Sequence, residues 1–378
     1  MPRLRFPEFT GVWENKRLGE LLEFKNGINA SKEQYGSGVK FINVLDILSN
    51  DFITYDNIVG KVNVDELIVE KFSVSYGDIL FQRSSETREE VGTANVYLDK
   101  NKNATFGGFV IRGKKIGEYN PVFFNKLLKT NSARENITSK SGGSTRFNVG
   151  QEILSSVNLY FPNLPEQDKI ASFLLFVDER IQTQKKIIEG LKTLKIQSRN
   201  KLFTQIIKGG YERFTVEEIL NYEQPTKYIV SSTDYSSDNS LIPVLTANKA
   251  FLLGYTNEDW GIYDKGKCIV LDDFTMDLKY VDFPFKIKSS AIKLLTSKKN
   301  IDLKFVFEYF SFLNMSSNEH KRHYISEIQP MFLNVPSEKI QKNISNFLSK
   351  LDEKINLENE LLTQYENQKK YLLQNLFV

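Results

Sequence analysis

Two stretches of the chain are copies of one segment: PNLPEQDKIASFLLFVDERIQTQKKIIEGLKTLKIQSRNKLF at Pro162–Phe203 and PSEKIQKNISNFLSKLDEKINLENELLTQYENQKKYLLQNLF at Pro336–Phe377. They align without a gap, and many more positions are identical than chance would give. Self-similarity of this kind indicates a duplicated structural unit. The identical pairs are Pro162/Pro336, Gln167/Gln341, Ile170/Ile344, Phe173/Phe347, Leu174/Leu348, Asp178/Asp352, Glu179/Glu353, Ile181/Ile355, Lys195/Lys369, Leu202/Leu376 and Phe203/Phe377.

Each copy predicts a long helix with one apolar face. Apolar residues recur at alternating spacings of four and three, which is the heptad pattern of a coiled coil. Both copies place a polar residue in this seam at the same step, Gln184 and Glu358, and such a residue costs stability and fixes register. About 40 residues rising 1.5 Å each make a rod of roughly 60 Å, which needs a partner for its apolar stripe. The expected interface between the two copies is Ile170, Leu174, Val177, Ile181, Ile188, Leu191 and Leu202 against Ile344, Leu348, Leu351, Ile355, Leu362, Tyr365 and Leu376.

The segments before the two helices differ in sequence but follow one plan. Short β-rich runs such as Asp78–Phe81 and Cys268–Leu271 alternate with turn signals, and a helical stretch comes late in each, at Pro121–Thr130 and Leu303–Leu313. We therefore predict an α+β protein in which two globular domains alternate with two long antiparallel helices, which form a coiled coil with a pseudo-two-fold axis. The predicted divisions are a first domain at 1–160, a first helix at 161–209, a second domain at 210–335 and a second helix at 336–378.

The composition excludes several classes of protein. With 378 residues, of which 40% are hydrophobic and 26% charged, the chain is long enough for two or three domains and is unlike a disordered protein. It has no run approaching the ~18–20 apolar residues of a membrane helix, and residues 1–7 lack the apolar run of a secretory signal. The single cysteine, Cys268, permits no internal disulfide, which suits a reducing cytoplasm. The two histidines, His320 and His323, have no third soft ligand nearby, so we expect no metal site and no cofactor.

Three motifs look catalytic until their context is considered. Gly261–Cys268 spells a P-loop except that Cys268 replaces the Ser or Thr that binds Mg²⁺, and an apolar strand follows instead of a helix. Asn120–Phe123 resembles the Asn-Pro-Pro-Tyr/Phe site of adenine methyltransferases, but lacks the second proline and a glycine-rich cofactor loop. Asp272 and Asp273 are interpreted as loop residues able to accept hydrogen bonds from cytosine amino groups. The sequence thus predicts no catalytic residue and disfavours a self-sufficient methyltransferase or nuclease.

Duplicated helices that carry unlike domains have a mechanical interpretation. Like helices offer one docking surface twice, which suits two copies of one partner, whereas unlike domains bind two different ligand pieces at a fixed distance. On DNA, rods of roughly 60 Å separate two recognition modules by more than one helical turn of ~34 Å. The net charge is only +3, so any DNA-binding surface must be local. A coiled-coil scaffold with two protein-binding heads and no DNA binding has the same layout and stays open as the alternative.

Both helices carry a Pro…Gln-x-x-Ile…Phe-Leu…Asp-Glu…Ile pattern, preceded by Phe-Pro in one case and Val-Pro in the other. These motifs are Pro165–Ile181 and Gln341–Ile355, with Gly77–Ser84, Val91-Gly92 and Phe106–Val110 in the first domain and Pro243–Asn248 and Asp272–Thr275 in the second. With them the chain resembles the specificity (S) subunits of type I restriction–modification systems over essentially its whole length. It departs from the pattern in the second helix, where Lys339-Ile340 replaces the expected Pro-Glu.

This resemblance implies a non-catalytic reader of double-stranded DNA in a restriction and adenine-methylation complex that defends against phage. Each globular domain is then a target-recognition domain that reads one half of an asymmetric, bipartite site, and the paired helices set the spacer. The helices also dock two adenine-N6 methyltransferase (M) subunits, to which restriction (R) subunits add.

Candidate DNA contacts are basic, polar or aromatic residues in loops of the two domains. Arg suits guanine and Asn suits adenine through bidentate hydrogen bonds, while Lys more often contacts phosphate. Arg83-Ser84 leads from a strand into an Arg/Ser/Thr-rich loop, and Gly142-Gly143 gives a second loop its backbone freedom. The candidates are Arg83, Ser84, Arg88, Lys140, Ser144, Thr145 and Arg146 in the first domain and Thr246, Asn248, Lys249, Tyr255, Lys321, Arg322 and Tyr324 in the second.

Overall fold

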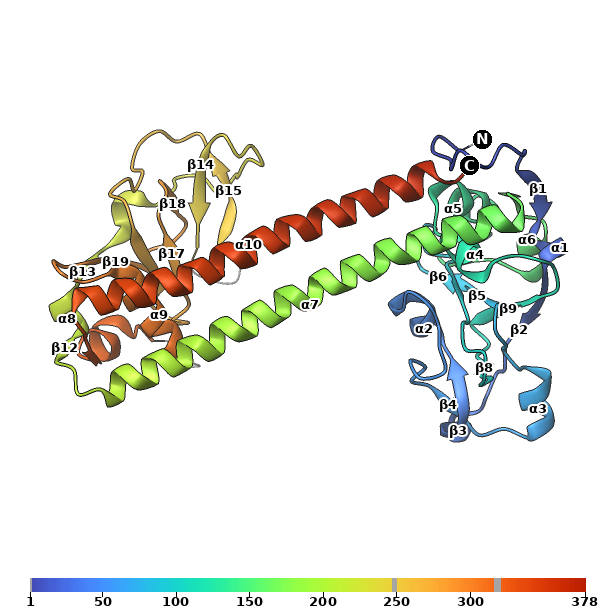
Figure 1. Cartoon of the computed structure of the whole chain (residues 1–378), viewed down its shortest axis with the longest axis horizontal. Helices are drawn as coiled ribbons and strands as arrows, with labels where there is room; N and C mark the ends of the chain where they lie inside the picture. The colour runs from blue at the N-terminus through green and yellow to red at the C-terminus, as the bar shows by residue number, and fades with distance from the viewer. Residues whose placement is uncertain (1, 247–249, 316–320) are drawn as a thin grey trace. The chain divides into compact units, whose positions relative to one another are not determined.

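A computed structural model describes residues 2–246, 250–315 and 321–378 (Figure 1). The chain forms two compact units, one of residues 1–184 with 361–378 and the other of residues 185–360. Each unit contains one globular domain and one end of each long helix. The units therefore cut across the predicted divisions, which separate domains from helices.

The two repeat copies form two long helices, α7 at Leu164–Lys208 and α10 at Glu338–Asn375. They have 45 and 38 residues, which correspond to rods of roughly 60 Å. Asn163 caps the start of α7, because its Oδ1 accepts a hydrogen bond of 3.0 Å from the Glu166 N–H. Gly210 follows the end of α7 with a φ of +67°, a left-handed conformation that glycine adopts without strain.

The strands of the first domain are β1 Glu14–Arg17, β2 Leu22–Asn26, β3 Tyr35–Ile42, β4 Lys61–Val62, β5 Ile79–Gln82, β6 Ser84–Ser85, β7 Ala94–Val96, β8 Thr105–Phe106, β9 Val110–Lys115, β10 Phe147–Asn148 and β11 Asn158–Phe161. Its main sheet is antiparallel, in the order β2-β9-β5-β7. A second sheet, β4-β3-β8, pairs β3 and β8 in parallel. The antiparallel pairs β1–β11 and β6–β10 complete the domain.

The strands of the second domain are β12 Arg213–Thr215, β13 Leu220–Glu223, β14 Ile242–Leu245, β15 Leu252–Thr256, β16 Cys268–Asp272, β17 Leu278–Val281, β18 Lys286–Ile287, β19 Ile292–Ser297 and β20 Phe332–Asn334. The main sheet has the order β13-β19-β16-β17, the second sheet β15-β14-β18 again has one parallel pair, and β12 pairs with β20. Each sheet thus repeats a sheet of the first domain strand for strand. The two domains share one fold, although their sequences share little beyond the plan of their elements.

Two of the shorter helices follow the same correspondence, α1 with α8 and α4 with α9. α4 and α9 coincide with the two late helical stretches expected from the sequence, and each follows the last strand of its domain's main sheet. α4 opens with a proline, whose missing N–H is not needed in the first turn. The helices are α1 Leu18–Leu21, α2 Val44–Ser49, α3 Glu66–Lys71, α4 Pro121–Leu128, α5 Asn131–Thr138, α6 Gln151–Ser155, α8 Val216–Ile219 and α9 Leu303–Leu313, with short 3-10 turns at Lys32–Gln34 and Pro225–Tyr228 and a π-helical turn at Tyr324–Ile328.

In each unit, the long helices and the globular domain share one hydrophobic core. Leu174 of α7 and Leu372 of α10 belong to the cluster that contains Phe123 of α4, and Phe377, just past the end of α10, joins it. In the other unit, Phe203 of α7 and Leu348 of α10 belong to the cluster around α9. Burying one side chain of this size contributes about 1.5–3 kcal/mol. The predicted α+β fold with a duplicated antiparallel helix pair is confirmed.

Candidate nucleic-acid interface and helix pair

In the first domain, the two loops expected to contact DNA lie side by side. β6 and β10 pair with Ser84 opposite Asn148, and the Ser84 hydroxyl donates a hydrogen bond to Asn148 Oδ1. This ladder holds the Arg83–Arg88 loop against the Lys140–Arg146 loop. Among the candidates, Arg83, Ser144, Thr145 and Arg146 are exposed and Ser84 is half-buried.

A hollow of about 740 Å³ is lined by residues of both loops, including Arg83 and Gly142-Gly143. Arg83 Nη1 donates a hydrogen bond of 3.3 Å to the Gly108 carbonyl, which fixes the guanidinium at this hollow. Gly143 has a φ of +114°, and a Cβ there would lie 2.1 Å from the Arg146 carbonyl oxygen. The turn therefore requires glycine. The lining also includes the amide side chains of Asn26, Asn148 and Gln151 and one carboxylate, Glu152. Amide and guanidinium donors suit the acceptor groups of a nucleic acid.

Two of the basic candidates brace the loops. Arg88 donates from Nε to the Thr138 carbonyl at 3.2 Å and from Nη2 to the Ser139 carbonyl at 3.3 Å. Lys140 Nζ donates to the Ser156 carbonyl at 2.8 Å. These cations hold the loops in place, which leaves Arg83 and Arg146 as the better-placed guanidinium groups for a ligand.

In the second domain, the β16–β17 hairpin takes the place of the Arg83–Arg88 loop. The His323 N–H donates hydrogen bonds to the carbonyl and to Oδ1 of Asp273, at 3.0 and 3.1 Å. These bonds bring the exposed Lys321-Arg322 pair to the hairpin, where the Arg322 guanidinium lies 6.0 Å from the centre of the Phe274 ring. The structure therefore joins a basic pair and a strand-end loop here too.

Asp272 and Asp273 of this hairpin have structural roles. Asp273 is buried, and its Oδ2 lies 3.2 Å from Nζ of the equally buried Lys293. Its interpretation as a base contact is therefore not supported. Asp272 Oδ1 accepts hydrogen bonds of 2.9 Å from the N–H groups of Phe274 and Thr275, which shapes the turn.

Tyr324 is buried, so its prediction as a DNA contact is not supported. Its side chain is only 1% exposed, and its ring centre lies 5.0 Å from that of Tyr222. Burial also raises the pKa of the Tyr324 hydroxyl. The sequence places Tyr324 beside the exposed basic pair, but the π-helical turn that begins at this residue directs the ring into the core.

The β14–β15 hairpin carries the remaining candidates. Thr246 is buried, and its N–H donates to the Phe251 carbonyl at 2.7 Å. Tyr255 is half-buried, and its N–H donates to the Ser236 carbonyl at 3.0 Å. Asn248 and Lys249 lie outside the described residues. A DNA contact by this group stays a prediction.

Trp260 is absent from the contact residues predicted from the sequence, although its side chain is 54% exposed. Nζ of the fully buried Lys286 lies 3.8 Å from the centre of the Trp260 ring and donates to the Trp260 carbonyl at 2.6 Å. It also pairs with Glu258 at 2.8 Å. The hydrogen bonds of Lys286 and Ser231 lower the pKa of Glu258 to about 2. An isolated tryptophan in a loop is a visible sequence signal, but the buried lysine that positions it is not.

Most of the expected seam residues of the helix pair are buried. Ile170, Leu174, Ile181, Ile188, Ile344, Leu348, Ile355 and Leu376 are buried, while Val177, Leu191, Leu202, Leu351, Leu362 and Tyr365 are half-buried. The polar seam residues Gln184 and Glu358 are buried as well. Sequence spacing missed Phe203 and Phe377, the repeat equivalents that follow Leu202 and Leu376. Phe203 is fully buried while Leu202 is half-buried, because α7 enters the core of the second domain there, whereas Leu376 and Phe377 are both buried in the core of the first domain.

Two ion pairs join the helices, and each helix supplies the lysine of one pair and the aspartate of the other. Lys369 of α10 lies 2.7 Å from Asp178 of α7 in one unit, and Lys195 of α7 lies 2.6 Å from Asp352 of α10 in the other. Both residue types are repeat equivalents. Reciprocal contacts of this kind follow from an antiparallel pair of duplicated helices.

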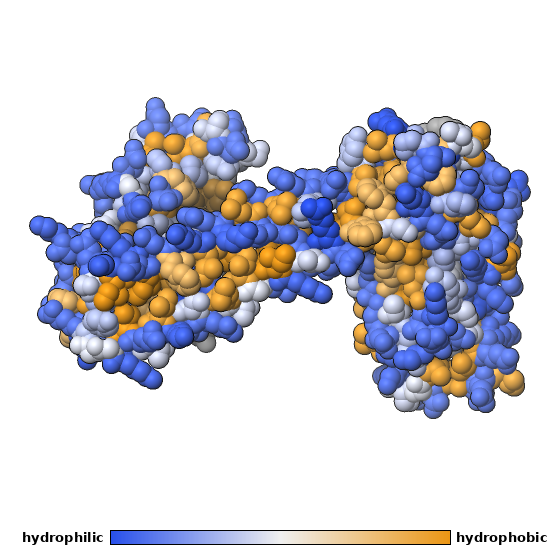
Figure 2. Space-filling view, in the orientation of Figure 1, coloured by the Kyte–Doolittle hydropathy of each residue, from blue (hydrophilic) through white to orange (hydrophobic). Residues whose placement is uncertain are grey.

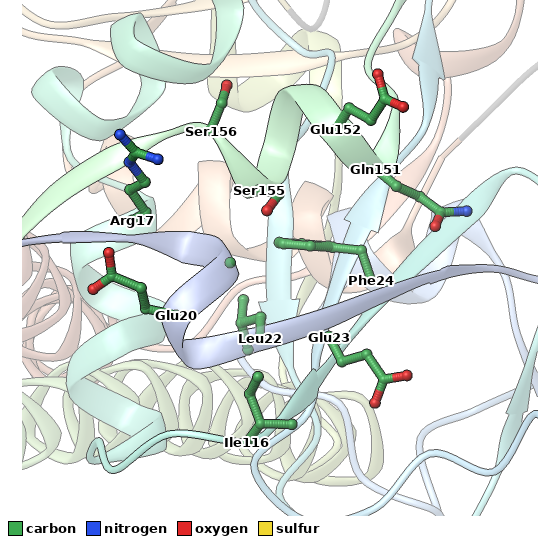
Figure 3. A pocket seen from close by; sticks show the side chains of 11 residues that line it. Arg17, Glu20, Leu22, Glu23, Phe24, Ile116, Gln151, Glu152, Ser155 and Ser156 are labelled. Carbon is green, nitrogen blue, oxygen red and sulfur yellow. The ribbon is translucent and has the colours of Figure 1, made fainter.

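A second hollow, of about 700 Å³, lies between α6 and the β1–α1–β2 segment of the first domain (Figure 3). Glu20, Glu23 and Glu152 line it together with a single arginine, Arg17. Three carboxylates oppose the approach of phosphate groups, so this hollow does not extend the nucleic-acid interface.

Within residues 2–246, 250–315 and 321–378, no three His, Cys, Asp or Glu side chains are placed to hold a metal ion. In the same residues, no helix is both long and apolar enough to cross a bilayer.

Two α+β domains of one topology, each attached to a copy of one long helix, define a class of two-headed proteins made by internal duplication. A sequence model of the type I restriction modification DNA specificity domain matches residues 11–193 and 208–367. The chain therefore belongs to this family.

The similar proteins are specificity subunits. The EcoR124I/EcoR124II specificity subunit of Escherichia coli is 48% identical over 126 residues, which are 32% of this chain and 31% of that protein. The match thus spans about a third of that relative's length. The putative type I restriction enzyme MjaX specificity subunit of Methanocaldococcus jannaschii is 23% identical over 96% of this chain and 92% of its own length.

Solved structures agree on the fold. An S subunit of a type I restriction–modification system from M. genitalium matches with a TM-score of 0.61 at 18% identity, covering 100% of this chain and 99% of that one. A chain from a structure on complex assembly of the type I R-M system matches with a TM-score of 0.56 at 11% identity, covering 97% of both chains.

Proposed function

We propose that this protein is the DNA-reading specificity subunit of a type I restriction–modification complex. The observation that carries the proposal is a pair of domains with one strand topology and unlike loops, held on a duplicated helix pair. In this proposal, residues 1–160 and 210–335 are target-recognition domains that read the two halves of an asymmetric, bipartite site. The helices at 161–209 and 336–378 set the spacer, and catalysis belongs to partner subunits in the cytoplasm.

The loops supply the contacts to double-stranded DNA. In the first domain, Arg83 at the hollow suits a guanine edge, and Ser144, Thr145 and Arg146 on the neighbouring loop suit phosphate and base acceptors. In the second domain, Lys321-Arg322 beside the β16–β17 hairpin has the same relation to the fold. The low net charge fits contacts concentrated on such loops.

The helices supply the docking surface for two M subunits, through which R subunits join. Apolar side chains stay exposed on both helices, namely Phe176 and Leu194 of α7 and Phe347 and Leu357 of α10. Hydrophobic side chains appear on the surface of the helical segments in Figure 2. Exposed aromatic and aliphatic side chains of this size are typical of protein interfaces. The duplicated helix pattern suits two copies of one partner, although these four exposed side chains do not occupy equivalent positions in the two copies.

Mapping of adenine methylation in cellular DNA, with and without this chain beside its methyltransferase, tests the proposal. The expected result is a split, asymmetric motif that disappears when the chain is absent. An unchanged methylation pattern, together with duplex binding that is absent or insensitive to salt, would favour the coiled-coil scaffold instead, since phosphate contacts weaken steeply with salt.

A further inference from the structure

The caps of α4 and α9 contact the long helices through an equivalent hydrogen bond. Asn120 caps α4 by accepting from the Phe123 N–H at 3.0 Å, and its own N–H donates to Gln167 Oε1 of α7 at 3.0 Å. Asp302 caps α9 in the same way at 2.8 Å, and its N–H donates to Gln341 Oε1 of α10 at 2.9 Å. The two junctions between a domain and the helix pair therefore correspond position by position.

Six residues after each cap, the equivalent positions carry side chains of opposite charge. Lys126 of α4 is 3% exposed and Glu308 of α9 is fully buried. Both side chains point at the helix pair, since Lys126 pairs with Asp178 of α7 and Glu308 pairs with Lys195 of α7. A buried charge needs partners of opposite sign, because its desolvation is otherwise uncompensated.

At the first junction, the partner is a carboxylate. Asp178 Oδ2 lies 2.5 Å from Lys126 Nζ, and Asp178 Oδ1 lies 2.7 Å from Lys369 Nζ. Burial acts to raise the pKa of Asp178, but the hydrogen bonds from the two lysines outweigh it and lower the pKa overall. Two cations thus share one anion.

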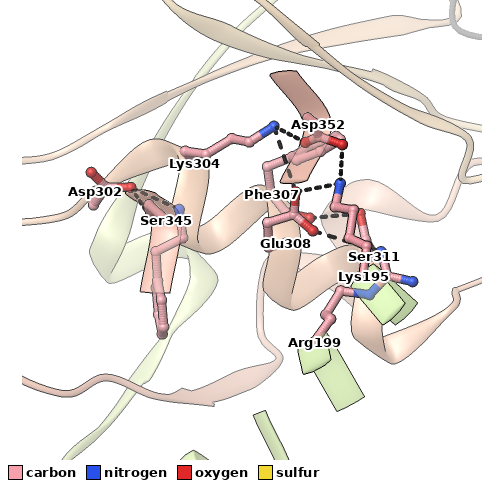
Figure 4. Close-up of polar contacts among 10 residues, drawn as sticks. Lys195, Arg199, Asp302, Lys304, Phe307, Glu308, Ser311, Ser345 and Asp352 are labelled. Carbon is pink, nitrogen blue, oxygen red and sulfur yellow. Dashed lines mark hydrogen bonds and ion pairs between the residues drawn. The ribbon is translucent and has the colours of Figure 1, made fainter. Parts of the chain in front are cut away.

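At the second junction, Glu308 is surrounded by cations (Figure 4). Its carboxylate oxygens lie 3.1 Å from Lys195 Nζ, 3.5 Å from Lys304 Nζ and 3.7 Å from Arg199 Nη1. Asp352, the repeat equivalent of Asp178, contacts Lys195 at 2.6 Å and Lys304 at 3.4 Å. Three cations here share two anions.

Two of these cations have no charged counterpart at the first junction. The helix equivalences place Val122 where Lys304 stands and Leu373 where Arg199 stands. The change from Lys126 to Glu308 is therefore accompanied by two added cations, and the same net charge of one positive unit results at both junctions.

We propose that Lys126 and Glu308 are docking keys that determine which end of the helix pair each globular domain fits. The end with Asp178 and Lys369 accepts a domain with lysine at this position. The end with Lys195 and Arg199 accepts one with glutamate. A domain moved from one position to the other then needs its key residue exchanged. This inference concerns docking of the domains and is independent of DNA binding.

The test measures whether one substitution raises or lowers the thermal midpoint of the full-length chain, first in the native sequence and then in a doubly substituted one. Glu308→Lys alone puts a fourth cation beside one anion, and we expect it to lower the thermal midpoint by about 5–10 °C. Lys304→Val with Arg199→Leu reproduces the neighbours of the first junction and leaves Glu308 with Lys195 only. In that background, Glu308→Lys should raise the midpoint.

A mirrored cycle supplies the control. Lys126→Glu should lower the midpoint alone and raise it in the background Val122→Lys with Leu373→Arg, while Lys126→Met removes the charge without inverting it. A key exchange that lowers the midpoint equally in the native and exchanged backgrounds, in both cycles, would overturn the proposal. The variants' effects on DNA sequence preference are not needed for this outcome, so it stands or falls separately from the reader function.

Discussion

The loops that follow β5 and β16 leave the same point of one fold but differ in length and support. After β5, the chain runs through residues 83–93 and forms β6, which pairs with β10 to hold a second loop in place. After β16, a tight turn over residues 273–277 returns at once to β17, and Asp273 is buried beside Lys293. The junctions of the two domains with the long helices instead share the contact between the helix cap and Gln167 or Gln341 and differ in their buried charges. The duplication has thus preserved where each domain attaches to the helices and changed the exposed loops, which is the division expected of two readers with different targets.

The largest effects should come from Phe203, in the last turns of α7, and Phe377, just after α10, which both pack into a domain core. Phe203→Ala removes a fully buried ring that packs 4.8 Å from Tyr309 and 5.3 Å from Phe305, and should cost about 3–5 kcal/mol of unfolding free energy. Phe377→Ala should cost less, because Phe377 keeps 6% exposure beside Phe123. Urea unfolding measures both. Phe176→Ala, at a site that is 73% exposed, should change stability by under about 0.5 kcal/mol, and a similar cost for all three would contradict the shared cores.

The next largest effects separate the two loops as DNA readers. Arg83→Ala should weaken binding by about 1–3 kcal/mol on duplexes that keep the half-site of the first domain, with little effect when that half-site is scrambled. Arg322→Ala should do the same for the other half-site. Titrations with the two half-scrambled duplexes measure this.

Lysine substitutions sharpen the same comparison. Arg83→Lys keeps the charge but loses the bidentate geometry, so it should retain salt-dependent binding and lose sequence preference. If Arg83→Ala weakened binding equally on every duplex, Arg83 would be a phosphate contact and the base-reading role assigned to it would be wrong.

Lengthening the long helices tests whether they set the spacer between the two half-sites. Inserting four residues after Lys192 lengthens α7 by about 6 Å, so the preferred spacer between half-sites should grow by about two base pairs with both half-sites unchanged. The same insertion after Glu366, the equivalent position in α10, should have the same effect if the helices act as one ruler. Methylation mapping reads both outcomes, and an unaltered spacer would reject the ruler.

The helix pair was predictable because its signal lies along the sequence. Heptad spacing and the identical pairs gave the long helices and most of the seam. Phe203 was not predicted to be buried, because the heptad pattern assigns the interface to Leu202. The Phe203 ring instead packs in the hydrophobic core around α9. The spacing of apolar residues along one helix does not show where a globular domain packs against that helix.

The surface was less predictable because it depends on pairings across the chain. Arg83 and Arg146 come from segments joined by the β6–β10 ladder, and no local signal predicts a ladder of two residues. Tyr324 looked like part of a basic patch, but a π-helical turn buries it. Charged residues such as Lys286 and Glu308 resemble surface residues in the sequence, since only the fold supplies the partners that let them be buried.

The smallest expected effect distinguishes the second sheets of the two domains. Lys286 opens β18, while Thr105 opens the equivalent β8, so only the second domain has the buried cation that pairs with Glu258. The pKa of Glu258 is lowered to about 2, so its ionised form favours the folded state. This contribution is complete above the ordinary glutamate pKa of about 4.3 and is lost as the pH falls toward 2. Trp260 fluorescence should therefore change between about pH 4 and pH 2 in the native chain. Glu258→Gln should abolish that change, and a transition that persists in this variant would place the acid-sensitive group elsewhere.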